Sequence, residues 1–277
     1  MSCLIFPSLF PYFKQLITAM KTKQSLRWLI AGGCVVLGLA AVLNAQASVV
    51  VGGTRLVYDA NEAEATIKLS NDDGKSPALV QSWVDTGDIK AAPSAIDAPF
   101  TVTPPIARID PGKGQTLRVV FTGEPQPQDR ESVFWLNVLE VPPKPGADQA
   151  DTNKLQLAFR TRIKLFYRPA GLKGSSNDAP GQIGWRLTHK DGRPFLEARN
   201  PTPYYVSFSA IEARSGGKTI PTNEAGMVPP MGNKAFPLKS DLPAAPDAKV
   251  FYSVLNDWGG SVEGDTALKP DNTPAAN

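Results

Sequence analysis

The sequence predicts an all-β protein made of two immunoglobulin-like β-sandwich domains. Three observations support this prediction: apolar residues recur at every second position in short runs, the runs end in Pro, Gly, Asn or Asp, and no long stretch repeats with the period of a helix. Residues 65–69, 117–121 and 133–141 are such runs, and each ends at turn-forming residues. Alternation of this kind is typical of strands that bury one face.

The N-terminal segment is predicted to be a secretory signal rather than part of the fold. Basic residues precede an apolar run at 28–43, which is followed by Ala-Gln-Ala at 45–47. This order predicts cleavage after Ala47. The apolar run is too short to span a membrane comfortably, and glycines interrupt it. Residues 1–47 are therefore the expected signal. Met20 would open a conventional signal by itself, so we interpret it as the true start.

The composition of the exported chain argues against several classes of partner. The signal contains four of the 29 basic residues and none of the 26 acidic ones, which leaves 25 basic against 26 acidic residues in the remaining 230. A net charge of about −1 gives no electrostatic reason to expect nucleic acid or anionic lipid as a partner. Both cysteines, Cys3 and Cys34, lie in the signal, so the exported chain must be stabilised by burial rather than by a disulfide.

Two sets of predicted strands indicate two domains. Residues 48–167 contain roughly seven, the number expected of one immunoglobulin-like sandwich. Arg-Pro-Ala-Gly at 168–171 then interrupts the pattern. The predicted strands that follow are 184–187, 195–199, 204–214 and 249–255, with a hairpin signal at Lys190-Asp191-Gly192. We therefore predict an N-terminal domain at 48–168, a C-terminal domain at 169–270 and a loose tail at 271–277.

Residues 154–167 alternate almost without interruption. The apolar members fall on one face and are Leu155, Leu157, Phe159, Ile163 and Leu165. The polar members fall on the other face and are Gln156, Arg160, Arg162 and Lys164. Periodicity alone predicts an ordinary half-buried strand, although the same apolar face could cover a hydrophobic groove.

At several separated places the sequence resembles the periplasmic chaperones of the chaperone-usher pathway, the PapD-like family. The most specific motifs are residues 129–143, which run from Asp-Arg-Glu-Ser-Val-Phe-Trp-Leu-Asn-Val to Pro-Pro, and residues 163–169, Ile-Lys-Leu-Phe-Tyr-Arg-Pro. Supporting motifs lie at 53–58, 200–205 and 255–259. Gln126 is a small departure, because the family tends to place an apolar residue just before the first motif. The resemblance covers nearly the whole exported chain.

The resemblance implies a fold and a function, which we state as expectations. It implies two immunoglobulin-like domains set at an angle with a cleft between them. It also implies a periplasmic chaperone that binds pilus subunits, prevents their aggregation and delivers them to an outer-membrane usher, with no cofactor. A free chaperone of this kind could shield its donor strand by self-association.

The resemblance also implies roles for individual residues. Arg55 and Lys164 are expected to hold the C-terminal carboxylate of a subunit, for which a guanidinium and an ammonium are suited. Leu155, Leu157 and Phe159 are expected to be donated to a subunit whose own sandwich lacks a strand. Glu131, Arg168 and Asp257 are expected to form a salt-bridge network that joins the two domains. Without the resemblance, these charges would be interpreted as solvated groups at strand ends.

The loop at 144–153, before the donor strand, is short, polar and free of cysteine. In this it resembles the short-loop branch of the family. That branch is associated with typical adhesive pili rather than with thin, capsule-like surface fibres.

Other functions find less support in the sequence. His189 is the only histidine and lies beside a turn, so the sequence does not favour a histidine-based catalytic triad or a metal cluster. The sequence also contains no phosphate-binding glycine loop. Neither a metal nor a small-molecule substrate is expected. A structural pilus subunit or adhesin should carry a donor extension and usually a disulfide, whereas residues 48–53 lead almost at once into the first strand. A generic periplasmic binding module is a further alternative, which neighbouring usher and subunit genes would distinguish.

Overall fold

The structure, a computed structural model, describes residues 49–90, 93, 97–141 and 157–269. The predicted signal, the loop at 144–153, Leu155 and the predicted tail lie outside the described residues. The named elements are strands and one short 3-10 helix, η3 (Pro180–Gln182), so the all-β prediction is confirmed. Within the described ranges, no helix has the length and apolar character needed to cross a membrane.

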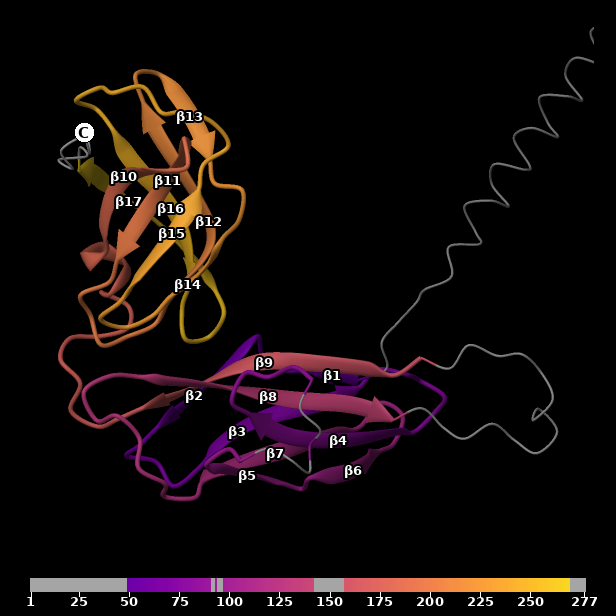
Figure 1. Ribbon diagram of the computed structural model, residues 1–277. Helices are drawn as coiled ribbons and strands as arrows, with labels where there is room; N and C mark the ends of the chain where they lie inside the picture. The colour runs from indigo at the N-terminus through magenta and orange to yellow at the C-terminus, as the bar shows by residue number, and fades with distance from the viewer. Residues whose placement is uncertain (1–48, 91–92, 94–96, 142–156, 270–277) are drawn as a thin grey trace, which may run out of the picture. The chain divides into compact units, whose positions relative to one another are not determined.

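The first sandwich consists of two sheets (Figure 1). Its strands are β1 (Val49–Val51), β2 (Arg55–Asp59), β3 (Ala65–Asn71), β4 (Ala78–Asp85), β5 (Phe100–Thr103), β6 (Ile106–Ile109), β7 (Gly114–Phe121), β8 (Ser132–Val141) and β9 (Phe159–Arg168). One sheet has the order β1-β3-β7-β5 and the other has the order β2-β9-β8-β4-β6. Neighbouring strands are antiparallel except β2 and β9, which run parallel.

The core of the first sandwich is formed by the inward-facing residues of both sheets. Leu69 and Leu117 from one sheet and Leu136 and Leu165 from the other are fully buried. Successive side chains of a strand point to opposite faces, and β3 accordingly alternates between buried and exposed residues. Burial of each such leucine stabilises the fold by about 1.5–3 kcal/mol. The period-two pattern therefore determines which face of each strand enters the core.

Aromatic packing ties β2 to β9. Tyr58 and Tyr167 are register partners on these strands, and their rings stack with centroids 6.0 Å apart. The ring of Phe121, from the opposite sheet, lies 4.6 Å from that of Tyr167. Pairs of this kind stabilise a sheet beyond the area that they bury, so the parallel register of β2 and β9 is held by side chains as well as by the backbone.

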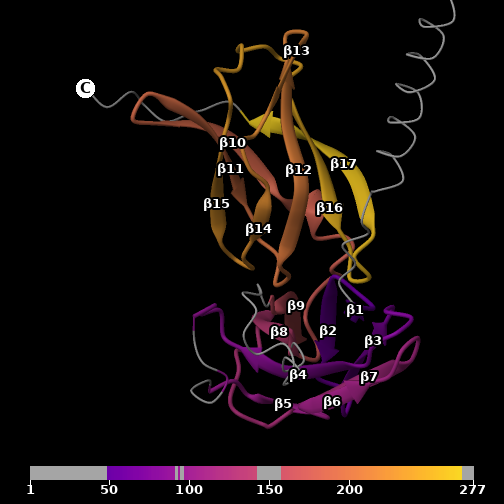
Figure 2. The same ribbon diagram turned by 90° about the vertical axis from the view of Figure 1, so that its right-hand side faces the viewer.

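The second sandwich contains the remaining strands, whose layers are seen from another side in Figure 2. They are β10 (Gly184–Lys190), β11 (Arg193–Arg199), β12 (Val206–Ser215), β13 (Lys218–Pro221), β14 (Gly226–Val228), β15 (Asn233–Pro237), β16 (Lys249–Leu255) and β17 (Ser261–Lys269). The strand order is β13-β12-β16-β17-β10-β11-β15, with β14 also paired to β12. A short parallel pairing of β10 with β17 joins the two layers. The buried rings of Trp185, Phe208, Phe236 and Tyr252 pack in the core.

The structure confirms two local predictions, a strand and a hairpin, and departs from the predicted alternation at one residue of β9. The predicted strand 249–255 has the bounds of β16. The predicted hairpin joins β10 to β11, and both Asp191 (φ 52°) and Gly192 (φ 70°) have the positive φ of a tight hairpin turn. In β9 the alternation holds for Ile163 and Leu165, which are buried, but Phe166 is buried as well because its ring packs on Tyr205.

Candidate functional site

Arg55 and Lys164 are direct register partners in the sheet of the first sandwich. Arg55 opens β2, Lys164 lies within β9, and the parallel pairing of these strands places the two residues opposite each other. Neighbouring strands lie about 4.8 Å apart, so backbone hydrogen bonding itself brings the two cations side by side. Both side chains are half-buried.

Arg55 is held by contacts that leave part of its guanidinium available. Nη1 donates a hydrogen bond of 3.0 Å to the carbonyl oxygen of Leu255, and the guanidinium carbon lies 5.7 Å from the ring centroid of Phe166. Nε is buried and has no hydrogen-bond acceptor among the described residues. Burial lowers the pKa of Arg55, and the charges of Asp257 and Glu131 offset this only in part. Among the described residues, Nη1 is the nitrogen of this guanidinium with a hydrogen-bond acceptor, so the group can still donate to a ligand.

Lys164 is in a similar position. Its ammonium lies 5.8 Å from the ring centroid of Trp135, and no carboxylate of the described residues forms an ion pair with it. Burial lowers the pKa of Lys164, and the nearby positive charges of Arg55 and Lys234 lower it further. Two adjacent cations that form no direct ion pair with a carboxylate of the described residues offer a site for an anion, and a carboxylate could accept hydrogen bonds from both.

A second group of charges lies around Arg168. Its Nε donates to Glu131 at 2.7 Å, and its Nη1 and Nη2 donate to the two oxygens of Asp257 at 2.8 and 3.0 Å. The other oxygen of Glu131 accepts the backbone N–H of Tyr205 at 2.8 Å, and Asp257 also accepts from Ser176 at 2.9 Å. The structure thus brings together the three residues expected to form a network, and the network contacts residues of both sandwiches.

Burial and pairing oppose each other in this network. Burial raises the pKa of Glu131, and Arg168 and the Tyr205 amide offset this only in part. Burial also acts to raise the pKa of Asp257, but hydrogen bonds and charge from Arg168 outweigh it and lower that pKa. For Arg168 burial acts to lower the pKa, while its two carboxylate partners raise it overall. Arg168 is therefore a permanent cation between two acidic groups in different environments.

The described part of the expected donor segment exposes its apolar side chains. Leu157 is 56% exposed and Phe159 is 52% exposed, although both are large apolar residues. The first half of β9, residues 159–163, pairs with β8, whereas β2 pairs only with residues 164–168. Among the described strands, this half of β9 therefore has one unpaired edge, which is the condition for adding a strand from another chain.

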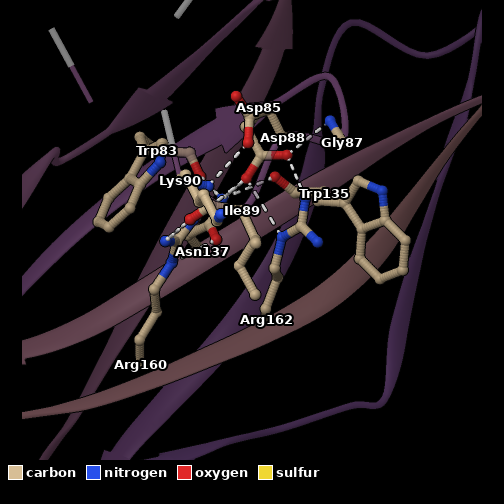
Figure 3. Close-up of polar contacts among 10 residues, drawn as sticks. All are labelled: Trp83, Asp85, Gly87, Asp88, Ile89, Lys90, Trp135, Asn137, Arg160 and Arg162. Carbon is tan, nitrogen blue, oxygen red and sulfur yellow. Dashed lines mark hydrogen bonds and ion pairs between the residues drawn. The ribbon is translucent and has the colours of Figure 1, made fainter. Parts of the chain in front are cut away.

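Sequence reasoning assigned no role to a polar cluster on the outer face of the same sheet (Figure 3). The cluster contains Trp83 and Asp85 of β4, Trp135 and Asn137 of β8, and Arg160 and Arg162 of β9. One signal was present in the sequence: Asn137 is a polar residue within the predicted strand 133–141. Both Asn137 and Asp85 are buried in the structure.

His189 takes no part in any of these groups. Its Nε2 lies 3.3 Å from an oxygen of Asp241, and both side chains are well exposed. No group of three or more potential metal-ligating residues occurs in the ranges that the structure describes.

Comparison with known proteins identifies the family. Residues 48–173 match the model of the pili and flagellar-assembly chaperone PapD N-terminal domain, and residues 178–266 match that of the pili assembly chaperone PapD C-terminal domain. Together these matches cover most of the chain. The chain therefore belongs to the PapD family of pilus-assembly chaperones.

Individual relatives agree with this assignment. The chain is 45% identical over 237 residues to the probable fimbrial chaperone YadV of Escherichia coli K12, which covers 85% of this chain and 96% of the relative. It is 42% identical over 242 residues to the chaperone protein FimB/FhaD of Bordetella pertussis, which covers 84% of this chain and 95% of the relative.

Solved structures show the same fold. The crystal structure of the YadV chaperone has a TM-score of 0.67 at 42% identity and covers 79% of this chain and 99% of that one. The SafB chaperone of Salmonella enterica, solved in complex with the SafA pilin, has a TM-score of 0.66 at 31% identity and covers 81% of this chain and 98% of that one. The expected function, a fimbrial chaperone rather than an enzyme, is confirmed for this family member.

Proposed function

We propose that this chaperone holds the C-terminal carboxylate of a pilus subunit between Arg55 and Lys164. The observation that carries this proposal is the register of β2 and β9, which places the two half-buried cations opposite each other with no carboxylate of the described chain between them. A carboxylate relieves their repulsion and satisfies donors that are otherwise partly desolvated. Fixing one end of a bound strand also fixes the register of its whole length.

The donated residues of the proposed mechanism are Leu155, Leu157 and Phe159. Support comes from the exposure of Leu157 and Phe159 and from the unpaired edge of residues 159–163. β-strand addition is an established mode for chaperone–pilin pairs as a class. A subunit with an incomplete sandwich exposes an apolar groove and unpaired backbone groups, and one donated strand covers both.

The proposed setting is the periplasm, reached through the predicted signal at residues 1–47. There the chaperone keeps subunits from aggregating and delivers them to an outer-membrane usher. The exposed donor strand of the free chaperone is also a candidate surface for self-association. Glu131, Arg168 and Asp257 serve to hold the two sandwiches together, with Arg168 as the shared partner.

The test is co-purification of a cognate subunit from periplasmic extract with wild type, Lys164→Ala and Arg55→Ala. Arg108→Ala is a matched control, because Arg108 lies in the same sheet and its side chain is 70% exposed. We expect wild type and the control to recover the subunit and both site variants to lose it, with all four proteins folded. Recovery by both folded site variants would exclude the anchor, and failure of wild type would exclude the chaperone–subunit interaction.

A chemical version of the test isolates the carboxylate. A synthetic peptide with the sequence of the subunit's last strand is prepared both as a free acid and as a C-terminal carboxamide. We expect wild type to bind the amide at least about tenfold more weakly than the acid. Lys164→Ala should bind the two peptides with similar, weak affinity. Equal binding of both peptides to wild type would contradict the anchor.

A further inference from the structure

Asp85 is a buried carboxylate at the end of β4, only 1% exposed, and donors from three neighbouring parts of the chain surround it (Figure 3). Its Oδ2 accepts from Asn137 Nδ2 at 2.8 Å, from Arg160 Nη2 at 3.2 Å and from Arg162 Nε at 3.2 Å. Its Oδ1 accepts from Arg162 Nη2 and, at 2.8 Å, from the backbone N–H of Gly87. Both oxygens of the carboxylate are thus fully used.

The two arginines are fixed by more than this carboxylate. The guanidinium of Arg160 lies 4.9 Å from the ring centroid of Trp83, and that of Arg162 lies 4.2 Å from the ring centroid of Trp135. Arg160 also donates to Asn137 Oδ1 at 2.9 Å and to the carbonyl oxygen of Ile89 at 2.8 Å. Stacking on one side and hydrogen bonds along the edge leave a guanidinium little freedom to rotate.

Strand register explains why these residues meet. Asn137 of β8 lies opposite both Trp83 of β4 and Arg162 of β9, and Trp135 lies opposite Asp85. All of them therefore occupy one face of three adjacent strands, with β8 in the middle. The long side chains of Arg160 and Arg162 reach from β9 across β8 to Asp85 on β4, so the contacts of one carboxylate link three strands.

The arginines are not available to bind another anion. Their side chains are only 25% and 16% exposed, and their donors already face Asp85, Asn137 and Ile89. Burial acts to raise the pKa of Asp85, but hydrogen bonds from Arg162, Asn137 and Gly87 outweigh it and lower that pKa, which keeps the carboxylate charged. The cluster is therefore suited to holding a strand rather than to capturing a ligand.

The strand that it holds is the half of β9 with an unpaired edge. Arg160 and Arg162 lie within residues 159–163, which β8 supports from one side. Because side chains alternate in a strand, fixing both arginines on the outer face directs Phe159 to the opposite face. A slip of one residue would reverse this arrangement and would bury charge in the apolar face.

We propose that Asp85 is a positioning residue for subunit binding. By holding Arg160 and Arg162 it keeps residues 159–163 of β9 extended and in register, with Phe159 exposed for contact with the subunit. This inference rests on the proposed function, since it concerns the same donor strand. Asp85, Asn137, Arg160 and Arg162 together form an arginine clamp. The clamp acts before a subunit arrives, so its effect can be measured on the free protein.

The first test is amide hydrogen exchange of free wild type and Asp85→Asn. Asparagine has nearly the same shape, but it carries no negative charge and offers one acceptor oxygen in place of two. We expect exchange of the amides of residues 160–163 that bond to β8 to accelerate at least about tenfold, while exchange in β3 and β7 stays unchanged. Asp110→Asn, in an exposed pair with Arg108 just after the end of β6, should change neither region. Uniform acceleration in all strands, or none in residues 160–163, would overturn the inference.

The second test compares subunit affinity in the same proteins, using the subunit recovered by wild type. We expect Asp85→Asn to weaken binding at least about tenfold, mainly through faster dissociation, and Asp110→Asn to leave it unchanged. Accelerated exchange together with unchanged affinity would overturn the positioning role. If wild type binds no subunit, the proposed function fails, and the exchange result still decides whether the clamp orders β9.

A milder variant covers the case in which Asp85→Asn does not fold. Arg160→Gln removes one guanidinium but leaves Asp85 its contacts with Arg162, Asn137 and Gly87. It should show the same local acceleration and a smaller loss of affinity. Arg160→Lys keeps the charge without the planar fork, and its affinity should lie between those of Arg160→Gln and wild type. Wild-type exchange and affinity in folded Arg160→Gln would contradict the inference.

Discussion

Arg55 and Lys164 are opposite each other in a parallel strand pair, so the backbone pairing of β2 and β9 fixes the separation of the two Cα atoms from which their side chains extend. A site that is formed before the ligand arrives loses less conformational entropy on binding. The arrangement also has a cost, because both cations are partly desolvated and repel each other.

This cost predicts that Lys164→Met stabilises the free protein. The change removes a half-buried charge that has no carboxylate partner among the described residues, and it keeps an apolar stem against Trp135. We expect the free energy of unfolding at pH 7 to rise by about 1 kcal/mol, the usual size of a gain from removing an unfavourable charge. Denaturant unfolding of both proteins measures it, and a loss of stability would contradict the unfavourable environment of Lys164.

The advantage of Lys164→Met should depend on pH. The pKa of Lys164 in the folded protein lies below its ordinary value of 10.5. Between the folded value and 10.5 the unfolded chain binds more protons, so the stability of wild type rises with pH relative to the variant. The advantage should therefore be constant at neutral pH and decline as pH approaches 10.5. A difference that grows over this range would show that the shift has the opposite sign.

The network around Arg168 predicts a non-additive mutant series. Arg168→Met leaves the buried Glu131 and the partly buried Asp257 without their cation, and should destabilise by about 3–5 kcal/mol. The triple variant Glu131→Gln, Arg168→Met, Asp257→Asn should be less destabilised than Arg168→Met alone. Thermal or denaturant unfolding measures both. Lys249→Met, at an exposed pair, is the control and should change stability by about 0.5 kcal/mol or less. Additive losses would exclude a coupled network.

The arginine clamp predicts a specific acid response. The pKa of Asp85 lies below its usual value of 3.8, so the stabilisation from its charge is present above pH 3.8 and is lost as pH falls through the folded-state pKa. In that window the stability of wild type should fall more steeply than that of Asp85→Asn, by up to about 1.4 kcal/mol per pH unit. Unfolding curves at closely spaced acidic pH values measure the two slopes, and parallel slopes would contradict the prediction.

The exposed donor residues predict behaviour of the free chaperone. Leu157→Asp and Phe159→Asp together place two charges on the apolar edge and should abolish both self-association and subunit binding. Sedimentation equilibrium over a range of concentrations measures the first, and co-purification measures the second. Thr101→Asp, at an exposed position of β5 in the other sheet, should leave both unchanged. Self-association that persists in the double variant would place the contact elsewhere.

The strands could be predicted from the sequence because their signal is local. Lys249–Leu255 alternates, and its bounds are those of β16. The local pattern could not identify the candidate anchor, because Arg55 and Lys164 meet only through the pairing of strands far apart in the chain. The resemblance to a family indicated that these two residues act together. The contacts of the clamp could not be predicted, because Asp85 lies 52 positions from Asn137 and 77 from Arg162, and no local periodicity relates them.

Trp135 joins the clamp to the anchor, since its indole ring lies beneath the guanidinium of Arg162 and also near the ammonium of Lys164. Indole emission responds to the charges and the polarity around the ring. Capture of an anion at Lys164 changes the field at this ring, whereas a loosened clamp changes its packing. Trp135 is thus an intrinsic fluorophore between the anchor and the clamp. Its emission can report, without an added label, whether the anchor is occupied and whether the clamp is ordered.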